Sequence, residues 1–286
     1  MKRAPDVEIA RVRAYWNRRP CNVQHSRAPV DTLQYSDEVK ARKYFVEPHI
    51  PRFAAFERWR GKRVLEIGCG IGTDTLNFAR AGAEVTAVDL SEASLRVAQQ
   101  RAATTGIRNI TFYQANAEEL DRVVPPEPYD LVYAFGVIHH TPRPERVMEQ
   151  IRRYYTRPGS VVKVMVYHRY AWKVLWILLV RGRGAFWRLD ELIAKHSEAE
   201  SGCPITYTYS RRSVARLFEG LRITDVRIEH IFPYRIPDYV NHKYVKVWYF
   251  RYLPESVFRW LERHAGWHLC VTAEVPMQLV VEPRTC

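Results

Sequence analysis

The sequence has few cysteines, and they form no recognisable metal-binding or disulfide pattern. Five cysteines occur among 286 residues, with no Cys-x-x-Cys pair and no even-numbered framework. This argues against a zinc-ribbon protein and against a disulfide-rich secreted domain. We expect free thiols in a reducing compartment, at Cys21, Cys69, Cys203, Cys270 and Cys286.

Long apolar runs are also absent. The longest uninterrupted run covers residues 174–180, far short of the ~20 residues that span a bilayer. The first six residues, Met-Lys-Arg-Ala-Pro-Asp, lack the apolar stretch of a signal peptide. From these two absences we expect a soluble, cytoplasmic protein.

Acidic residues are outnumbered, which gives the chain a net charge of +13. This charge favours an anionic partner such as nucleic acid, acidic lipid or a carboxylate or phosphate substrate, unless the arginines merely lie on solvated helix faces. Nucleic acid is disfavoured because the chain has no arginine-rich block, RNA-binding aromatic motif or zinc finger.

The histidines predict no metal site. No Asp/His cluster has metal-ligand spacing, and the histidines outside the predicted active site are scattered along the chain. These scattered histidines are His25, His49, His230, His242, His264 and His268.

Glycine is sparse, at 13 residues, yet three glycines cluster after one apolar segment. Gly68, Gly70 and Gly72 follow residues 63–67 directly. Glycines at alternate positions let the backbone turn tightly and approach a ligand closely. Asp89 ends a second apolar segment, and its carboxylate can accept both hydroxyls of a ribose. The pattern predicts a nucleoside-containing ligand.

The glycine spacing distinguishes between two such ligands. A dinucleotide fingerprint reads G-x-G-x-x-G, whereas this chain reads E-x-G-x-G-x-G with Glu66 first. Glu66 would repel a pyrophosphate but suits a ligand with positive charge. The segment resembles motif I of class I S-adenosylmethionine-dependent methyltransferases, whose cofactor carries a sulfonium and an ammonium and no phosphate. The alternatives are a non-catalytic S-adenosylmethionine-binding subunit and a nicotinamide-dependent oxidoreductase.

Apolar and amphipathic segments alternate between residues 62 and 167, which predicts an α/β protein with a doubly wound parallel sheet. The resemblance implies a Rossmann-like sheet of seven strands with an antiparallel last strand. We predict strands at 63–67, 84–88, 110–114, 129–134, 160–166, 222–230 and 268–275. We predict helices at about 35–45, 74–81, 91–104, 144–155 and 210–219.

Two parts of the chain lie outside this alternation. Residues 1–60 are predicted to form an N-terminal arm or cap, which either closes over the cofactor or packs on the sheet. Residues 61–286 are predicted to form the methyltransferase domain, with aromatic inserts at about 168–207 and 231–266. The inserts either pack as a cap, or form an apolar pocket or a basic surface that touches lipid, or bind a protein or peptide acceptor.

The resemblance also implies the cofactor contacts. Gly68 and Gly70 would approach the methionine part, Asp89 the ribose, and Asn116 the adenine amino group through its carbonyl oxygen. The full predicted cofactor set is Trp16, Glu66, Gly68, Cys69, Gly70, Asp74, Asp89, Leu90, Asn116, Ala117, Phe135 and Gly136.

The segment 136–142, Gly-Val-Ile-His-His-Thr-Pro, resembles that of small-molecule methyltransferases of the ubiquinone-biosynthesis type (methyltransferase type 11). It lacks the Asn-Pro-Pro-Tyr of amino-methylating nucleic-acid enzymes. Methyl transfer to a hydroxyl or amine needs alignment and removal of a proton, for which histidine is a natural base. Candidates are His139, His140 and His168, with Tyr167 as polar lining. We expect methylation of an O, N or C atom of a small-molecule or lipid-like acceptor.

Overall fold

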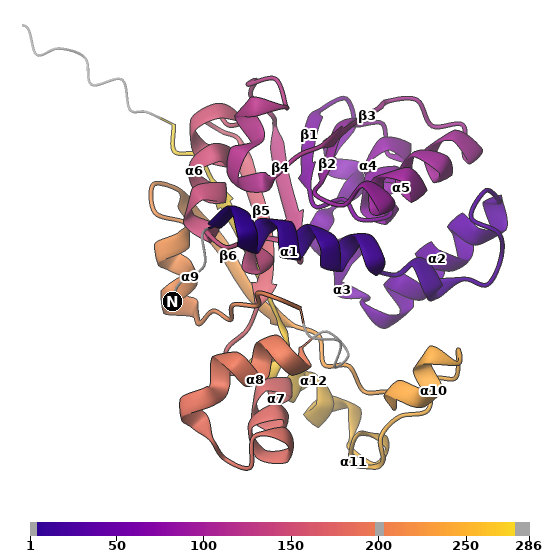
Figure 1. Cartoon of the computed structure of the whole chain (residues 1–286), viewed down its shortest axis with the longest axis vertical. Coiled ribbons are helices and arrows are strands. Elements are labelled where there is room, and N and C mark those ends of the chain that lie inside the picture. The colour runs from indigo at the N-terminus through magenta and orange to yellow at the C-terminus, as the bar shows by residue number, and fades with distance from the viewer. Residues whose placement is uncertain (1–4, 198–202, 278–286) are drawn as a thin grey trace, which may run out of the picture.

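The protein, in a computed structural model, is described over residues 5–197 and 203–277. Residues 1–4 of the predicted arm, residues 198–202 of the first predicted insert, and Cys286 lie outside this range. A seven-stranded sheet with strand order β3-β2-β1-β4-β5-β7-β6 forms the centre (Figure 1). The strands are β1 (Arg63–Ile67), β2 (Glu84–Asp89), β3 (Ile110–Gln114), β4 (Leu131–Phe135), β5 (Val161–Tyr167), β6 (Arg222–Glu229) and β7 (His268–Glu274).

The sheet confirms the predicted fold class. Strands β3, β2, β1, β4 and β5 are parallel, and β7 runs antiparallel to both β5 and β6. Every predicted strand occurs, and each of its ends lies within two residues of the predicted end. These segments form strands because they are short apolar runs that end at glycine or polar residues.

Helices cover both faces of the sheet. Alternate residues of β1 point to opposite faces, so Leu65 and Ile67 enter one apolar cluster while Val64 enters another. The first cluster is completed by α6 (Pro144–Tyr154) and α9 (Arg211–Leu217), the second by α4 (Thr73–Arg80) and α5 (Glu92–Thr104). The predicted helix start of α5 is confirmed, since the Ser91 side chain accepts from the backbone N–H of Ser94.

The N-terminal segment contains more helix than we predicted. It forms α1 (Pro5–Arg18), a 3₁₀ turn η1 (Val23–His25), α2 (Leu33–Val46), α3 (His49–Ala54) and a 3₁₀ turn η2 (Phe56–Trp59). Only α2 was predicted. Helix α1, indigo in Figure 1, crosses in front of the sheet and contacts α5.

Apart from α9, the helices that follow β5 and β6 gather at one end of the molecule, at the bottom of Figure 1. They are α7 (Trp172–Trp176), the π turn η5 (Ile177–Arg181), the 3₁₀ turn η6 (Phe186–Arg188), α8 (Leu189–His196), α10 (Ile236–Val240), α11 (Trp248–Arg251) and α12 (Glu255–Ala265). Some of their aromatics are buried against each other, such as Phe250 and Phe258. Others, Trp187 and Trp248, are about three-quarters exposed. Lipid contact by these segments stays a prediction.

Among the described residues, no helix has both the length and the apolar character needed to cross a membrane.

Candidate active site

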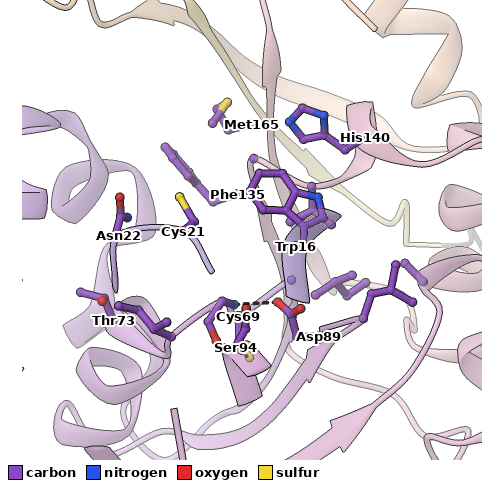
Figure 2. A pocket seen from close by; sticks show the side chains of 18 of the residues that line it. Trp16, Cys21, Asn22, Cys69, Thr73, Asp89, Ser94, Phe135, His140 and Met165 are labelled. Atoms are coloured by element: carbon purple, nitrogen blue, oxygen red, sulfur yellow. Dashed lines mark hydrogen bonds between the residues drawn. The ribbon is translucent and has the colours of Figure 1, made fainter. Parts of the chain in front are cut away.

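A cavity of about 350 Å³ lies at the carboxyl ends of the central strands (Figure 2). This is where open α/β sheets bind their ligands, and the volume lies within the range of small-molecule sites. Its walls come from the glycine loop after β1, the ends of β2, β4 and β5, the N-terminal arm, and the segments around His230 and His268. The cavity therefore joins parts of the chain that are distant in sequence.

The loop after β1 reaches the cavity because its glycines adopt backbone angles that other residues avoid. Gly68 has φ +75°, and a Cβ there would lie 2.0 Å from Cγ2 of Val137. Gly70 has φ +54°, and no atom of the described residues lies within 4 Å of a Cβ placed there. Gly68 is thus required by packing, whereas Gly70 leaves a space that a ligand can enter.

Asp89 is held in place by the backbone on both sides. Its Oδ2 accepts from the N–H of Gly70 at 2.8 Å, and its Oδ1 accepts from the N–H of Ser91 at 2.7 Å. Burial raises the pKa of Asp89, while these backbone donors act in the opposite direction. Each carboxylate oxygen keeps a second lone pair, so a vicinal diol could still donate to Asp89.

The neighbouring wall is suited to a flat apolar ring. It contains Leu90, Ala115 and Ala117, together with Asn116. The Oδ1 of Asn116 already accepts from the backbone N–H of Glu118 at 3.1 Å, which caps the 3₁₀ turn η3 (Ala117–Arg122). An adenine amino group would therefore share this oxygen, and the predicted contact of Asn116 stays a prediction.

Helix α1 supplies the cover of the cavity. The ring of Trp16 packs edge-on against His140, with ring centroids 5.6 Å apart (Figure 2). The next residue, Asn17, accepts through Oδ1 from the Ser91 hydroxyl at 2.9 Å and from the Ala93 N–H at 3.3 Å. The arm is thus tied to the start of α5, directly beside Asp89.

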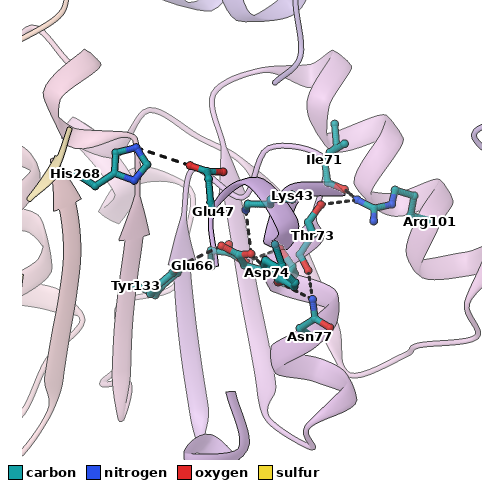
Figure 3. A network of polar contacts seen from close by, with 12 residues as sticks. Lys43, Glu47, Glu66, Ile71, Thr73, Asp74, Asn77, Arg101, Tyr133 and His268 are labelled. Atoms are coloured by element: carbon teal, nitrogen blue, oxygen red, sulfur yellow. Dashed lines mark hydrogen bonds and ion pairs between the residues drawn. The ribbon is translucent and has the colours of Figure 1, made fainter. Parts of the chain in front are cut away.

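Two predicted cofactor residues, Glu66 and Asp74, do not line this cavity. The Thr75 hydroxyl donates to Glu66, while Asp74 accepts from Lys43 at 2.9 Å and from Tyr133 at 3.1 Å (Figure 3). Burial, together with the nearby charge of Asp74, raises the pKa of Glu66 to about 8. Both carboxyls belong to a network beneath the glycine loop, and Glu66, with this raised pKa, is mostly uncharged near pH 7.

The four candidate catalytic residues divide into two pairs. His140 and Tyr167 line the cavity, whereas His139 and His168 do not. His168 is buried and its Nδ1 lies 3.1 Å from the Gly266 carbonyl oxygen. Neither ring nitrogen of His139 has a hydrogen-bond partner within the described part of the chain, and burial lowers the pKa of His139 well below the usual 6.5.

The ring of His140 is held by the backbone at one of its two nitrogens. It ends the 3₁₀ turn η4 (Ile138–His140), and its Nδ1 lies 2.8 Å from the carbonyl oxygen of Ile205. A carbonyl only accepts hydrogen bonds, so this contact places the ring proton on Nδ1. The neutral ring then carries its basic lone pair on Nε2.

Three of the histidines that are scattered along the sequence lie together in the structure, contrary to our expectation. His230 and His268 line the cavity together with Glu47, and His49 packs against His268. The proximity of His230 and His268 had a signal in the sequence. His230 directly follows the end of β6, and β6 pairs Glu229 with His268 at the start of β7. The approach of Glu47 and His49, from the far end of the chain, had no such signal.

The sheet order, the antiparallel β7 and the glycine loop facing an acidic strand end define the class I methyltransferase fold. Solved structures agree. Magnesium protoporphyrin IX methyltransferase from Synechocystis PCC 6803 with bound SAH matches with TM-score 0.57 and 17% identity, covering 93% of this chain and 99% of that one. The YcgJ protein from Bacillus subtilis matches with TM-score 0.56 and 14% identity, covering 81% and 99%. At these identities the likeness concerns the fold.

The methyltransferase domain family matches residues 59–206, just over half of the chain, and the chain belongs to this family. The predicted recognition as an S-adenosylmethionine-dependent methyltransferase is thereby confirmed. Ubiquinone biosynthesis O-methyltransferase of Pseudomonas fluorescens is 37% identical over 102 residues, 36% of this chain and 43% of that protein. The Proteus mirabilis protein of the same name is 34% identical over 122 residues, 43% of this chain and 48% of that one. The chain thus spans less than half the length of these curated relatives.

Proposed function

We propose that this protein transfers a methyl group from S-adenosylmethionine to a small-molecule or lipid-like acceptor. One observation carries the proposal: a single cavity holds an open glycine loop, a backbone-anchored Asp89 and, on another wall, the imidazole of His140. A nucleoside site and a base thus face the same space. An acceptor that enters beside the nucleoside would meet both.

The cofactor would lie along the carboxyl ends of β1, β2 and β4. Its ribose hydroxyls would donate to Asp89, its adenine would lie between Leu90 and Ala117, and its methionine part would pass Gly70. Phe135 and Gly136, at the end of β4, would then border the sulfonium. The glycine loop would contact no phosphate in this arrangement, because S-adenosylmethionine has none. Glu66 lies beneath the backbone of this loop.

The reaction would be an in-line displacement. The acceptor atom forms a bond to the methyl carbon while the bond from that carbon to sulfur breaks, leaving S-adenosylhomocysteine. For a hydroxyl acceptor, the proton would pass to Nε2 of His140. The names of the curated relatives, ubiquinone biosynthesis O-methyltransferases, favour oxygen over nitrogen or carbon as the acceptor atom.

Isothermal titration calorimetry of the purified protein with S-adenosylhomocysteine and, separately, with NAD tests the cofactor assignment. We expect saturable binding of S-adenosylhomocysteine and none of NAD. The opposite result would identify a nicotinamide enzyme and overturn the proposal.

Methyl transfer itself is tested by incubating the protein and a cell extract with methyl-labelled S-adenosylmethionine. We expect labelled product with wild type and less of it with Asp89→Ala at a limiting concentration of S-adenosylmethionine. Equal labelling by the two proteins would contradict the proposal, and cofactor binding with no labelled product would favour a non-catalytic binding subunit.

A further inference from the structure

Three side chains that could hold a metal ion converge at the cavity. Glu47, His230 and His268 each offer one ligand atom, and these atoms lie within 4.8 Å of one another. The Nε2 of His268 lies 3.7 Å from Oε1 of Glu47 (Figure 3). This separation exceeds a direct hydrogen bond. It is close to the roughly 3.3–3.6 Å between two ligand atoms that share one tetrahedral ion at metal distances of ~2.1 Å.

A fourth side chain orients this set. Nε2 of His49 lies 2.9 Å from Nδ1 of His268. When His268 donates from Nδ1, its Nε2 carries the lone pair on the side of Glu47. Metal-bound histidines are commonly fixed in this way by a partner on the second ring nitrogen. With its Nε2 as the acceptor, His49 holds His268 in the tautomer that a metal ion requires.

The backbone of His230 adds a second sign of a specialised position. His230 has φ +72°, a conformation that a residue with a Cβ seldom adopts. Its carbonyl oxygen accepts from the N–H of Trp267 at 2.7 Å, which holds this geometry. Strained residues of this kind concentrate at ligand and active sites. Here the strained backbone belongs to a residue that lines the cavity.

The three candidate ligands differ in their exposure to solvent. His230 and His268 are buried, at 7% and 4% exposure. Glu47, which supplies a carboxylate, is partly exposed.

We propose that Glu47, His230 and His268 bind a divalent transition-metal ion, of which Zn²⁺ is the representative. Two imidazoles and one carboxylate suit Zn²⁺ and its first-row neighbours and leave coordination positions open for a further ligand. The role of this ion in catalysis rests on the function proposed above. The metal site itself does not depend on it.

The open positions would face the acceptor. The ring of Phe135, which borders the proposed sulfonium position, lies 5.5 Å from that of His268 and 5.9 Å from that of His49. An acceptor hydroxyl bound to the ion would therefore lie beside the methyl donor. The ion would supply Lewis-acid chemistry that lowers the pKa of this hydroxyl. His140 would take its proton, and the oxygen would bond to the methyl carbon as the carbon–sulfur bond broke.

The charges around the site indicate the class of acceptor. A divalent ion with one carboxylate retains a charge of +1. Lys43 is paired with Asp74 at 2.9 Å, whereas Lys173, 4.7 Å from the centroid of the neutral Trp267 ring, keeps its positive charge near His230 and His268. An anionic ligand would complete the charge balance of this buried site. We therefore infer an acceptor with an acidic hydroxyl, such as a phenol or an enol.

The metal site is tested on chelator-treated protein with the ions alone. We expect one equivalent of Co²⁺ to bind with a visible absorption band, and Zn²⁺ to displace it. His230→Ala should weaken Zn²⁺ binding, measured by calorimetry, at least tenfold, and Glu47→Gln should also weaken it. His264→Ala is the matched control, because His264 is exposed on α12 and outside the cavity. Its Zn²⁺ affinity should equal that of wild type.

Absence of bound ion in wild type, or equal Zn²⁺ affinity in wild type and His230→Ala, would overturn the metal site. Thermal melts and S-adenosylhomocysteine titrations of every variant distinguish loss of the metal site from unfolding and from loss of the cofactor site. A His230→Ala protein that folds and binds S-adenosylhomocysteine but not Zn²⁺ supports the proposal. S-adenosylhomocysteine binding without any Zn²⁺ binding in wild type removes the metal site and leaves the proposed function intact.

Discussion

The backbone N–H of Gly70 donates to Oδ2 of Asp89 across 2.8 Å, which joins the glycine loop to the end of β2. The loop of one strand thus holds the carboxylate of its neighbour. Because Ser91 holds the other oxygen, the carboxylate is oriented before any ligand arrives. Such preorganisation reduces the cost of binding.

Asp89→Ala should therefore weaken S-adenosylhomocysteine binding at least tenfold, or about 1.4 kcal/mol, because charge-assisted hydrogen bonds to the ribose are lost. Isothermal titration calorimetry measures the affinity. Glu92→Gln, on the exposed first turn of α5, is the control and should bind as wild type does. Unchanged affinity in a folded Asp89→Ala protein would remove Asp89 from the site.

Gly68→Ala should destabilise the fold more than a glycine replacement elsewhere at similar φ. Gly106 has φ +70° but, among the described residues, no neighbour within 4 Å of a Cβ, so Gly106→Ala incurs only the backbone cost. At Gly68 the contact with Val137 adds overpacking, typically about 1–3 kcal/mol. Thermal unfolding of the two variants measures the difference. Equal melting temperatures would show that the loop moves away from Val137 without cost.

His140→Ala should lower turnover about 10²-fold or more while S-adenosylhomocysteine affinity changes little, since a general base acts on the reacting proton. Initial rates with an acceptor found in the labelled extract provide the readout. His264→Ala is the matched variant, because His264 is exposed on α12 and does not line the cavity. It should retain turnover. If His140→Ala turns over at the wild-type rate, the base lies elsewhere.

Glu66→Gln should change how stability depends on pH. The pKa of Glu66 is about 8 in the folded protein, against a usual 4.5, because burial penalises its charge. Between these values the folded chain binds more protons than the unfolded chain, so this group's contribution to the free energy of unfolding falls as pH rises. Melting temperatures of Glu66→Gln should fall less than those of wild type from about pH 5 to pH 8. Parallel curves would contradict the raised pKa.

The fold could be predicted because its signals are local. Most strands are short apolar runs that end at glycine or polar residues, and β6 alternates apolar with polar residues. Ser91 and Pro144 mark helix starts where the structure has them. Helix α1 was missed because it buries only a few side chains, Val12 and Tyr15 among them, and so has a weak apolar stripe.

Only part of the site was predicted, because the sequence shows which segments reach the cavity but not where each side chain points. Glu66 lies on the same face of β1 as Val64, beneath α4, although its segment leads into the cavity. The three proposed metal ligands come from the end of α2, the end of β6 and the start of β7. Strand pairing and the path of the N-terminal arm bring these ligands together. Neither can be inferred from the spacing of residues along the chain.

The tie between Asn17 and Ser91 has a consequence for the catalytic cycle. Helix α1 lies over the cavity, and its hydrogen bonds to the start of α5 flank the same strand end that would hold the ribose. S-adenosylhomocysteine leaving on this side would have to break these hydrogen bonds of Asn17. The rate of turnover would then depend on the movement of α1 away from the cavity as well as on methyl transfer itself.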